Sequence, residues 1–129
     1  MKIEHVALWT NQLEEMKDFY VEFFNGTANN KYSNIQKHFE SYFISFQSGA
    51  RLEIMCKPGL IALKSEDAKL PMGFEHLAFS VGCKELVDEL TIKLQQRGYQ
   101  LVSGPRTTGD GYYESCILDP DGNKIEITV

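Results

Sequence analysis

Two histidines and two glutamates occupy matching places in the two halves of this chain. The string Glu-His-Val-Ala-Leu contains His5, and the similar string Glu-His-Leu-Ala-Phe contains His76. Later in each half, a basic residue and an aliphatic residue precede a glutamate and an isoleucine, with Glu53 in the first half and Glu126 in the second. The spacing from His5 to Glu53 nearly equals that from His76 to Glu126, which indicates an internal duplication. Because imidazole and carboxylate without thiolate suit Zn, Ni, Co, Fe or Mn, the four residues are candidate ligands of a single divalent ion.

The reaction most natural to such a set is proton abstraction next to a carbonyl. Four protein ligands in an octahedral field leave two positions for water or substrate. An ion with open positions can polarise a carbonyl or stabilise an enediolate as a Lewis acid. A glutamate that loosens from the ion can act as a general base. A lone histidine or glutamate on a strand is usually structural, but the duplication of all four favours a shared site.

The elements around these residues must bring them to one face of a sheet. Residues 3–10, 50–56, 74–81 and 123–129 alternate as strands do. Successive side chains of a strand lie on opposite faces, so the four candidate ligands fall on the face opposite the aliphatic residues. Small side chains at Ala7 and Ala78 lie on the ligand face and leave open volume there. We therefore expect a cup lined by polar ligands.

The first half is predicted to fold as β-α-β-β. Asn11 and Glu14 resemble a capping box, and apolar residues then recur at helical spacing until Asn25-Gly26 ends the helix. The strands expected after this helix are residues 39–47 and 50–56, with a further strand possible around residues 29–35.

The second half repeats this plan as β-α-β-β-β. Its helix is expected at residues 84–97, with Leu86, Leu90 and Leu94 on the buried side and Gly98 ending it. The strands expected are residues 74–81, 99–103, 112–119 and 123–129, with a hairpin turn at residues 120–122.

The predicted fold class is α+β, with two tandem modules in one domain that spans residues 1–129. The modules cover about residues 1–57 and 74–129. A linker with a weakly helical stretch is expected at about residues 58–73, because this segment opens with Pro-Gly and closes with Pro-Met-Gly.

Composition excludes several function classes. Lys and Arg number 13 against 18 Asp and Glu, a formal net charge of −5, which argues against binding to nucleic acid. The chain shows no signal-peptide pattern and no apolar run near the roughly 20 residues of a membrane span. The three cysteines are scattered without a Cys-x-x-Cys pair, so neither a disulfide framework nor a thiolate zinc site is expected. We expect a cytoplasmic protein with no membrane partner.

The duplicated plan, the His-Glu-His-Glu order and the string Leu-Asp-Pro-Asp-Gly-Asn-Lys-Ile-Glu at residues 118–126 resemble the vicinal oxygen chelate superfamily, and within it glyoxalase I (lactoylglutathione lyase). The resemblance implies the glyoxalase/bleomycin resistance/dioxygenase fold, in which paired modules curl a sheet around a metal-binding cup. It implies that His5, Glu53, His76 and Glu126 are metal ligands, that Glu126 shuttles a proton, and that Glu53 is the second catalytic glutamate.

The same resemblance implies an activity and its partners. The reaction would convert the hemithioacetal of a 2-oxoaldehyde into a 2-hydroxyacyl thioester, so the substrate is a small thiol adduct of an aldehyde. One divalent ion per site is implied, with Ni or Co favoured and Zn possible. A homodimer is implied as well, which leaves open whether the site forms within one chain or between two.

Substrate contacts are expected from aromatic and basic residues. Glyoxalase I usually carries an arginine shortly after the first histidine, whereas residues 6–10 here hold no cation, so the thiol partner stays open. Arg106 could supply a basic group. Trp9, Tyr112 and Tyr113 could form aromatic walls, although a packing role is equally compatible with their positions.

Four further residues receive structural interpretations. Glu4 and Glu75 begin their strands with the parity of the apolar set, so we interpret them as solvated strand ends. His38 lies in a polar stretch without a counterpart in the other half and is interpreted as a surface residue. Arg51 is most simply an exposed solubilising residue.

Two alternatives to the glyoxalase hypothesis remain. One is another enzyme on this scaffold, such as a thiol transferase that opens fosfomycin, an extradiol dioxygenase or an acyl-CoA epimerase. Transferases and dioxygenases of this superfamily generally use two histidines and one carboxylate, and the epimerases tend to have glutamine where Glu53 stands. The other alternative is a metal-free binding protein of the bleomycin-resistance kind, against which the retention of all four ligand types argues.

Overall fold

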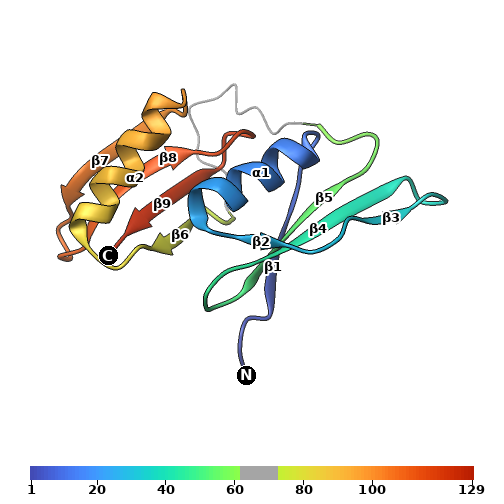
Figure 1. The fold of residues 1–129 in the computed structure, drawn as a ribbon, viewed down its shortest axis with the longest axis horizontal. Coiled ribbons are helices and arrows are strands. Elements are labelled where there is room, and N and C mark those ends of the chain that lie inside the picture. Colours follow the sequence, from blue (N-terminus) through green and yellow to red (C-terminus); the bar gives the residue numbers. More distant parts are fainter. Residues whose placement is uncertain (62–72) are drawn as a thin grey trace. The chain divides into compact units, whose positions relative to one another are not determined.

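The computed structural model describes residues 1–61 and 73–129. The chain divides into two compact units, Met1–Phe74 and Glu75–Val129, and each unit combines one long helix with one sheet (Figure 1). The predicted α+β class with two modules is confirmed. Most of the predicted linker, including its weakly helical stretch, falls on residues 62–72, which lie outside the described residues.

The first unit contains a mixed sheet. Strand β1 is parallel to β5, β5 is antiparallel to β4, and β4 pairs in antiparallel fashion with both β2 and β3. The elements are β1 (His5–Trp9), α1 (Leu13–Phe24), β2 (Thr27–Ala28), β3 (Tyr32–Asn34), β4 (Phe39–Ser45) and β5 (Arg51–Cys56).

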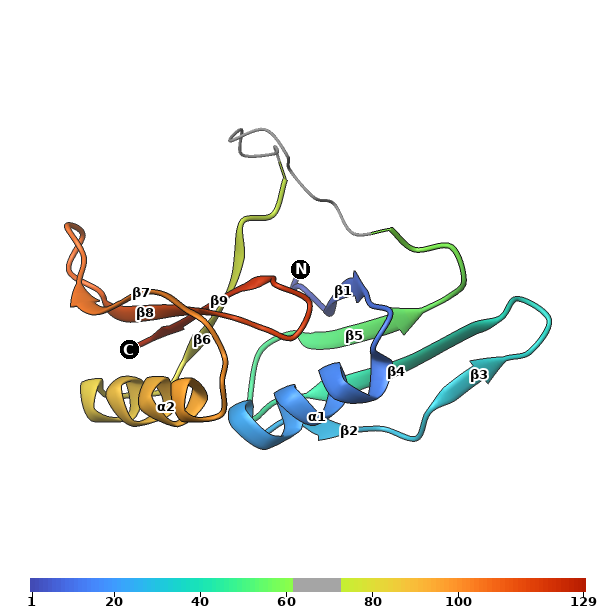
Figure 2. The same cartoon turned by 90° about the horizontal axis from the view of Figure 1, so that it is seen from above.

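Helix α1 packs against one face of this sheet (Figure 2). The helix ends where the sequence predicted, because Asn25 adopts the left-handed conformation and the Gly26 amide donates to the Tyr20 carbonyl at 3.1 Å. Apolar side chains from both layers are removed from water and form the core of the unit. The core residues are Leu13, Met16, Phe19, Tyr20, Phe23 and Phe24 from α1, and Tyr42, Ile44, Leu52 and Ile54 from the sheet.

The predicted capping box of α1 is wrong. The N-cap residue is Gln12, and its amide donates to Thr10 Oγ1 at 2.9 Å. Asn11 instead donates from its side-chain amide to the Leu60 carbonyl at 3.4 Å. Glu14, the other expected member of the box, instead contacts Tyr42 of β4 and the side chains of Lys17 and Lys31.

The second unit repeats the arrangement with a four-stranded sheet in the order β6-β9-β8-β7. Strand β6 is parallel to β9, and the other pairs are antiparallel. Helix α2 packs against one face of the sheet (Figure 2). The elements are β6 (His76–Ser80), α2 (Lys84–Gln96), β7 (Leu101–Thr107), β8 (Tyr113–Leu118) and β9 (Lys124–Thr128).

The buried side of α2 differs from the predicted leucine stripe. Val87, Thr91 and Leu94 are buried, whereas Leu86 is 45% exposed. Thr91 is accommodated in the core because its hydroxyl donates to the Val87 carbonyl at 2.6 Å and lies 2.6 Å from Ser115 Oγ. A polar group that is fully hydrogen-bonded can be buried at little cost, and hydrophobic spacing alone does not reveal the partner. No helix among the described residues is long and apolar enough to cross a membrane.

The predicted hairpin turn between β8 and β9 is confirmed, and Asp119 organises it. This residue is 4% exposed, and one carboxylate oxygen accepts from the amides of Asp121 and Asn123 at 3.0 and 2.8 Å. Gly122 supplies the positive φ of 85° that the turn needs. The hairpin holds β9 in register beside β8 and thereby orients Glu126.

Glu14 connects α1 to the sheet and its neighbours. Its carboxylate accepts from Tyr42 Oη at 3.1 Å and pairs with Lys31 Nζ at 2.7 Å and Lys17 Nζ at 3.1 Å. The hydrogen bond from Lys31 is the main cause that lowers the pKa of Glu14 to about 2. These contacts form only in the folded chain, so they link folding to the ionisation of Glu14.

We expect Glu14→Gln to reduce the free energy of unfolding at pH 7 by less than about 1 kcal/mol, because the side chain is 53% exposed and solvent screens its ion pairs. The folded pKa of about 2 lies below the ordinary glutamate value of 4.5, so this stabilisation is complete above pH 4.5 and is lost as the pH falls towards 2. Urea unfolding from pH 7 to pH 3 measures it, with exposed Glu15→Gln as control. A difference between wild type and Glu14→Gln that does not shrink below about pH 4.5 would contradict the assignment.

Candidate functional site

Strand pairing in each unit sets the face on which the candidate ligands lie. In the first unit Ala7 is paired with Glu53, and in the second Ala78 is paired with Glu126. The neighbours of the two glutamates in sequence are buried on the opposite, helix-covered face: Leu52, Ile54, Ile125 and Ile127. The alternation predicted from the sequence is therefore observed, and the ligand face of each sheet is the one away from its helix.

Each unit brings one histidine close to one glutamate. His5 Nε2 lies 3.9 Å from Glu53 Oε2, and His76 Nε2 lies 3.6 Å from Glu126 Oε2. The histidines are 41% exposed, whereas Glu53 and Glu126 are only 16% and 20% exposed. Two long-range pairs thus recur with the same atoms facing each other.

Both separations are compatible with two donors of one divalent ion. Imidazole nitrogen and carboxylate oxygen bind such ions at about 2.0–2.2 Å, which puts two donors of one ion roughly 3–4 Å apart. Within residues 1–61 and 73–129, no group of three or more His, Cys, Asp or Glu side chains is gathered for a metal. Each unit therefore contributes one imidazole and one carboxylate, His5 with Glu53 in the first unit and His76 with Glu126 in the second.

The interpretation of Glu4 and Glu75 as solvated strand ends was incomplete. Both carboxylates are about half exposed, but each contacts the imidazole of the next residue. Glu4 Oε2 lies 2.5 Å from His5 Nδ1, and Glu75 Oε2 lies 2.6 Å from His76 Nδ1. The duplicated Glu-His dipeptide was the sequence signal for these contacts, although alternation alone assigned the glutamates to the other face.

A basic residue binds each of these glutamates. Arg51 donates from Nε and Nη2 to Glu4 Oε1 at 2.9 and 2.5 Å, and Lys124 Nζ donates to Glu75 Oε1. The hydrogen bond with His5, followed by that with Arg51, lowers the pKa of Glu4. The hydrogen bond with Lys124, followed by that with His76, lowers the pKa of Glu75.

The solubilising role expected for Arg51 is not what the structure shows. Besides binding Glu4, its guanidinium carbon lies 4.2 Å from the centroid of the Phe43 ring, and the same ring meets His5 edge-on at 5.4 Å. Arg51 therefore forms part of the surroundings of His5, as a consequence of the register that pairs these two residues.

The surroundings of Glu126 raise the pKa of its carboxyl group above the usual value. Burial is the largest cause that raises its pKa, and the negative charge of Glu114 is the next. Glu114 is 17% exposed and also lies 3.8 Å from Arg106 Nη2. Glu114 was not predicted from the sequence, because a glutamate in a strand is usually a solvated residue and its neighbour Glu126 comes from a different strand.

The aromatic residues predicted to contact substrate have different surroundings. Trp9 is 44% exposed, with Lys57 Nζ 4.5 Å above its ring and Phe39 edge-on at 6.1 Å. Tyr112 is 55% exposed in the loop after β7. Tyr113 donates its hydroxyl to Asp88 Oδ1 on α2 at 2.8 Å, which supports the packing alternative for this residue.

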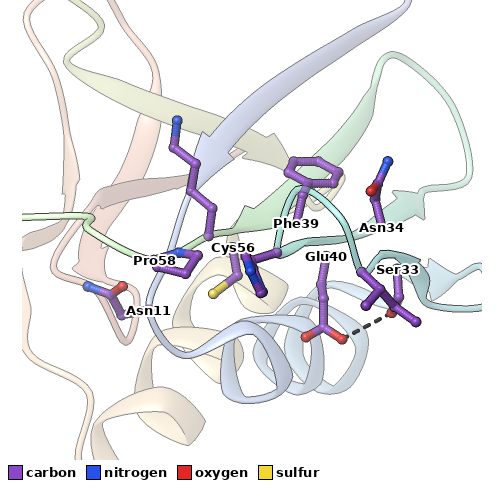
Figure 3. Close-up of a pocket in the computed structure, with 10 residues that line it drawn as sticks. Asn11, Ser33, Asn34, Phe39, Glu40, Cys56 and Pro58 are labelled. Carbon is purple, nitrogen blue, oxygen red and sulfur yellow. Dashed lines mark hydrogen bonds between the residues drawn. The ribbon is translucent and has the colours of Figure 1, made fainter.

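A cavity of about 510 Å³ lies in the first unit, between the β3–β4 hairpin and the segment that follows β5. Figure 3 shows Ser33 and Glu40 joined by their hydrogen bond, with Phe39 and Cys56 nearby. His38, interpreted as a surface residue, is exposed and also lines this cavity. The other lining residues are Asn11, Asn34, Ile35, Lys57 and Pro58. The cavity is therefore distinct from the His5–Glu53 pair, and Phe39 and Lys57 connect it to Trp9.

Comparison with known proteins supports the fold and identifies the family. The chain is 29% identical over 128 residues to the uncharacterized protein YqjT of Bacillus subtilis (strain 168), covering 97% of this chain and 96% of that protein. A glyoxalase family protein from Enterococcus faecalis is similar in structure, with a TM-score of 0.80 and 24% identity over 99% of this chain and 97% of that one. The trypanothione-dependent glyoxalase I of Leishmania major gives a TM-score of 0.76 and 20% identity over 99% and 86% of the two chains.

The model of the glyoxalase/bleomycin resistance protein/dioxygenase superfamily matches residues 2–127, nearly the whole chain. This match agrees with the duplicated β-sheet units and with the resemblance carried by the His-Glu-His-Glu order. The chain therefore belongs to the glyoxalase/bleomycin resistance protein/dioxygenase superfamily, also called the vicinal oxygen chelate superfamily.

Proposed function

We propose that this protein is a metal-dependent lyase of the glyoxalase I kind. The reaction converts the hemithioacetal of a 2-oxoaldehyde into a 2-hydroxyacyl thioester by moving a proton between adjacent carbons. His5, Glu53, His76 and Glu126 together hold one divalent ion, with nickel or cobalt favoured and zinc possible. The proposal extends to a homodimer in the cytoplasm and leaves open whether one chain or two supply the four ligands.

The observation that carries this proposal is the repeated pairing of imidazole Nε2 with a carboxylate oxygen, at 3.9 Å in one unit and 3.6 Å in the other. Two pairs supply two imidazoles and two carboxylates, a donor set that suits a borderline divalent ion. The second carboxylate, from Glu53, favours the glyoxalase chemistry over family members that use two histidines and one carboxylate.

The chain's own residues would carry the proton transfer. Glu126 is the proposed base, because burial and the neighbouring Glu114 raise its pKa and thereby strengthen its affinity for a proton. It would take a proton from the carbon that bears the hydroxyl group and return it to the adjacent carbon. Glu53 holds the equivalent position in the other unit and is the second candidate. A bound divalent ion would stabilise, as a Lewis acid, the negative charge left on the substrate oxygens.

Substrate contacts in this proposal come from residues with available surface. Arg106 is 59% exposed and lies on the strand next to Glu114, so it can offer its guanidinium to an acidic group of the thiol partner. Arg51 is already engaged with Glu4 and Phe43. Trp9 and Tyr112 are sufficiently exposed to offer aromatic surfaces to the adduct.

We expect Glu126→Gln to lower kcat for a hemithioacetal substrate by about 10²–10⁴-fold, the range typical for loss of a general base. The protein is reconstituted separately with nickel, cobalt and zinc and assayed with several thiols. Elemental analysis should find one ion per site in the wild type and a large loss of metal in His5→Ala and in His76→Ala. His38→Asn is the matched control, because His38 has a φ of 48° that asparagine tolerates.

Two outcomes would reject this function. Metal content near zero after purification without chelators would favour the metal-free binding protein of the bleomycin-resistance kind. Stoichiometric metal with no turnover for any thiol would leave the metal site intact and point to another reaction on the same scaffold.

Removing the charge of Glu114 gives a second, independent test, which asks whether this charge raises the pKa of Glu126. The folded-state pKa of Glu126 is raised above the ordinary glutamate value of 4.5, so the ionised form opposes folding once the pH exceeds 4.5. Removing the negative charge of Glu114 should relieve part of this penalty.

We expect Glu114→Gln, with metal removed by EDTA, to raise the free energy of unfolding at pH 7 by about 0.5–1 kcal/mol. The gain should disappear as the pH falls below the ordinary glutamate value of 4.5, because Glu126 is then protonated in both the folded and the unfolded state. Urea unfolding at both pH values measures it. In a Glu126→Gln background the same substitution should give no gain, and an equal gain there would show that Glu114 acts on another group.

A further inference from the structure

The two histidines make the same contacts through the same ring atoms. In each unit Nδ1 faces the carboxylate of the preceding residue, at 2.5 Å for Glu4 and 2.6 Å for Glu75. In each unit Nε2 faces the glutamate of the parallel neighbouring strand. The two ring nitrogens therefore have different partners, and the assignment of partner to nitrogen is identical in both units.

This division determines which nitrogen can bind a cation. A neutral imidazole carries its proton on one nitrogen and a lone pair on the other. A carboxylate next to Nδ1 favours the tautomer with the proton on Nδ1, and the Nε2 lone pair is then available to a metal. A neutral histidine in water favours the opposite tautomer. The carboxylate contact should therefore shift the tautomer population measurably towards the Nδ1–H form.

A cation holds each carboxylate in place. Arg51 contacts Glu4 through two nitrogens, and Lys124 contacts Glu75. Both cations reach the glutamate from a fixed position, because Arg51 is the register partner of His5 and Lys124 is the register partner of His76. The stem of Arg51 is further restrained by its guanidinium lying on the Phe43 ring.

Exposed ion pairs are common and usually contribute little, so one such contact would carry no functional weight. Here, however, both halves of the internal duplication retain the same three interacting residues, a glutamate, a histidine and a cation. Neighbouring side chains on a strand normally lie on opposite faces, so Glu4 and Glu75 contact their histidines only because they stand just before β1 and β6 begin.

We propose that Glu4 and Glu75 are positioning residues that hold His5 and His76 in the Nδ1–H tautomer, and that Arg51 and Lys124 anchor these two carboxylates. This inference deepens the proposed function. Its statement about metal binding rests on that function, whereas its statement about the tautomers does not. Each unit thus contains a chain of contacts from a cation through a glutamate to an imidazole, which ends at the Nε2 lone pair.

The tautomers can be observed directly in the metal-free protein. Long-range ¹H–¹⁵N correlation at about pH 8.5, where an ordinary histidine is neutral, distinguishes the two ring nitrogens of each histidine. We expect the Nδ1–H tautomer at His5 and His76 in the wild type. Glu4→Ala should convert only His5, and Glu75→Ala only His76, to mainly the Nε2–H form. His38 is an internal reference that neither variant should change, and exposed Glu15→Ala is the matched control.

Metal affinity gives a second measurement, in which the direction of the change in Kd distinguishes the explanations. Competition with a chromophoric chelator should show Kd for nickel or zinc raised about 10-fold or more by Glu4→Ala. Loss of a negative charge would also weaken cation binding, so the deciding variant is Arg51→Met, which removes a positive charge. Simple electrostatics predicts tighter binding for Arg51→Met, whereas loss of the anchor predicts weaker binding. Lys37→Met, with the same change of charge at an exposed site, is its control.

The outcomes separate this inference from the proposed function. Wild-type protein with His5 and His76 in the Nε2–H form, or unchanged tautomers in Glu4→Ala and Glu75→Ala, would overturn the inference whatever the metal content. Tighter metal binding by Arg51→Met would overturn the anchoring role. Absence of metal in wild-type protein with the expected tautomers would instead reject the proposed function and retain the roles of Glu4 and Glu75 towards the histidines.

Discussion

The parallel pairing of the first strand of each unit with the last is the constraint on which the candidate site depends. β1 lies beside β5, and β6 lies beside β9, in equivalent registers. Since side chains alternate along both strands, this pairing puts a histidine, an alanine and a glutamate on one face and aliphatic residues on the other. A register shift of one residue would bury the glutamates under the helices, where an unpaired carboxylate is costly. Packing of the core therefore maintains the geometry of the candidate ligands.

The same register explains why each histidine has a cation nearby. Arg51 stands opposite His5 and Lys124 stands opposite His76, so a glutamate placed before either strand can contact both its histidine and the facing cation. The fold itself is shared by proteins with different chemistry, so function must be argued from the side chains that each sheet presents. In this chain those side chains are two imidazole–carboxylate pairs together with their charged neighbours.

Local sequence rules failed where tertiary contacts outweigh them. The capping-box prediction used only spacing, whereas the Glu14 carboxylate contacts Lys31 and Tyr42. The leucine stripe of α2 was predicted from hydrophobicity, but Thr91 is buried because Ser115 on β8 supplies a hydrogen-bond partner. Glu114 was overlooked for the same reason, because its neighbour Glu126 belongs to a different strand. In each case the deciding partner is distant in sequence.

The amino-acid sequence was enough to predict the duplication, both helices, most of the strands and the face on which His5, Glu53, His76 and Glu126 lie, although the short strand β2 was not predicted. Periodicity sets these features, because alternation along a strand and spacing along a helix are local properties of the chain. The folded structure was needed to find which nitrogen of each histidine faces which carboxylate, and that Arg51 binds Glu4 and Lys124 binds Glu75. The repeated Glu-His dipeptide marks these residues, but the atoms that meet and the cation that binds each glutamate depend on strand register and on distances of a few ångströms.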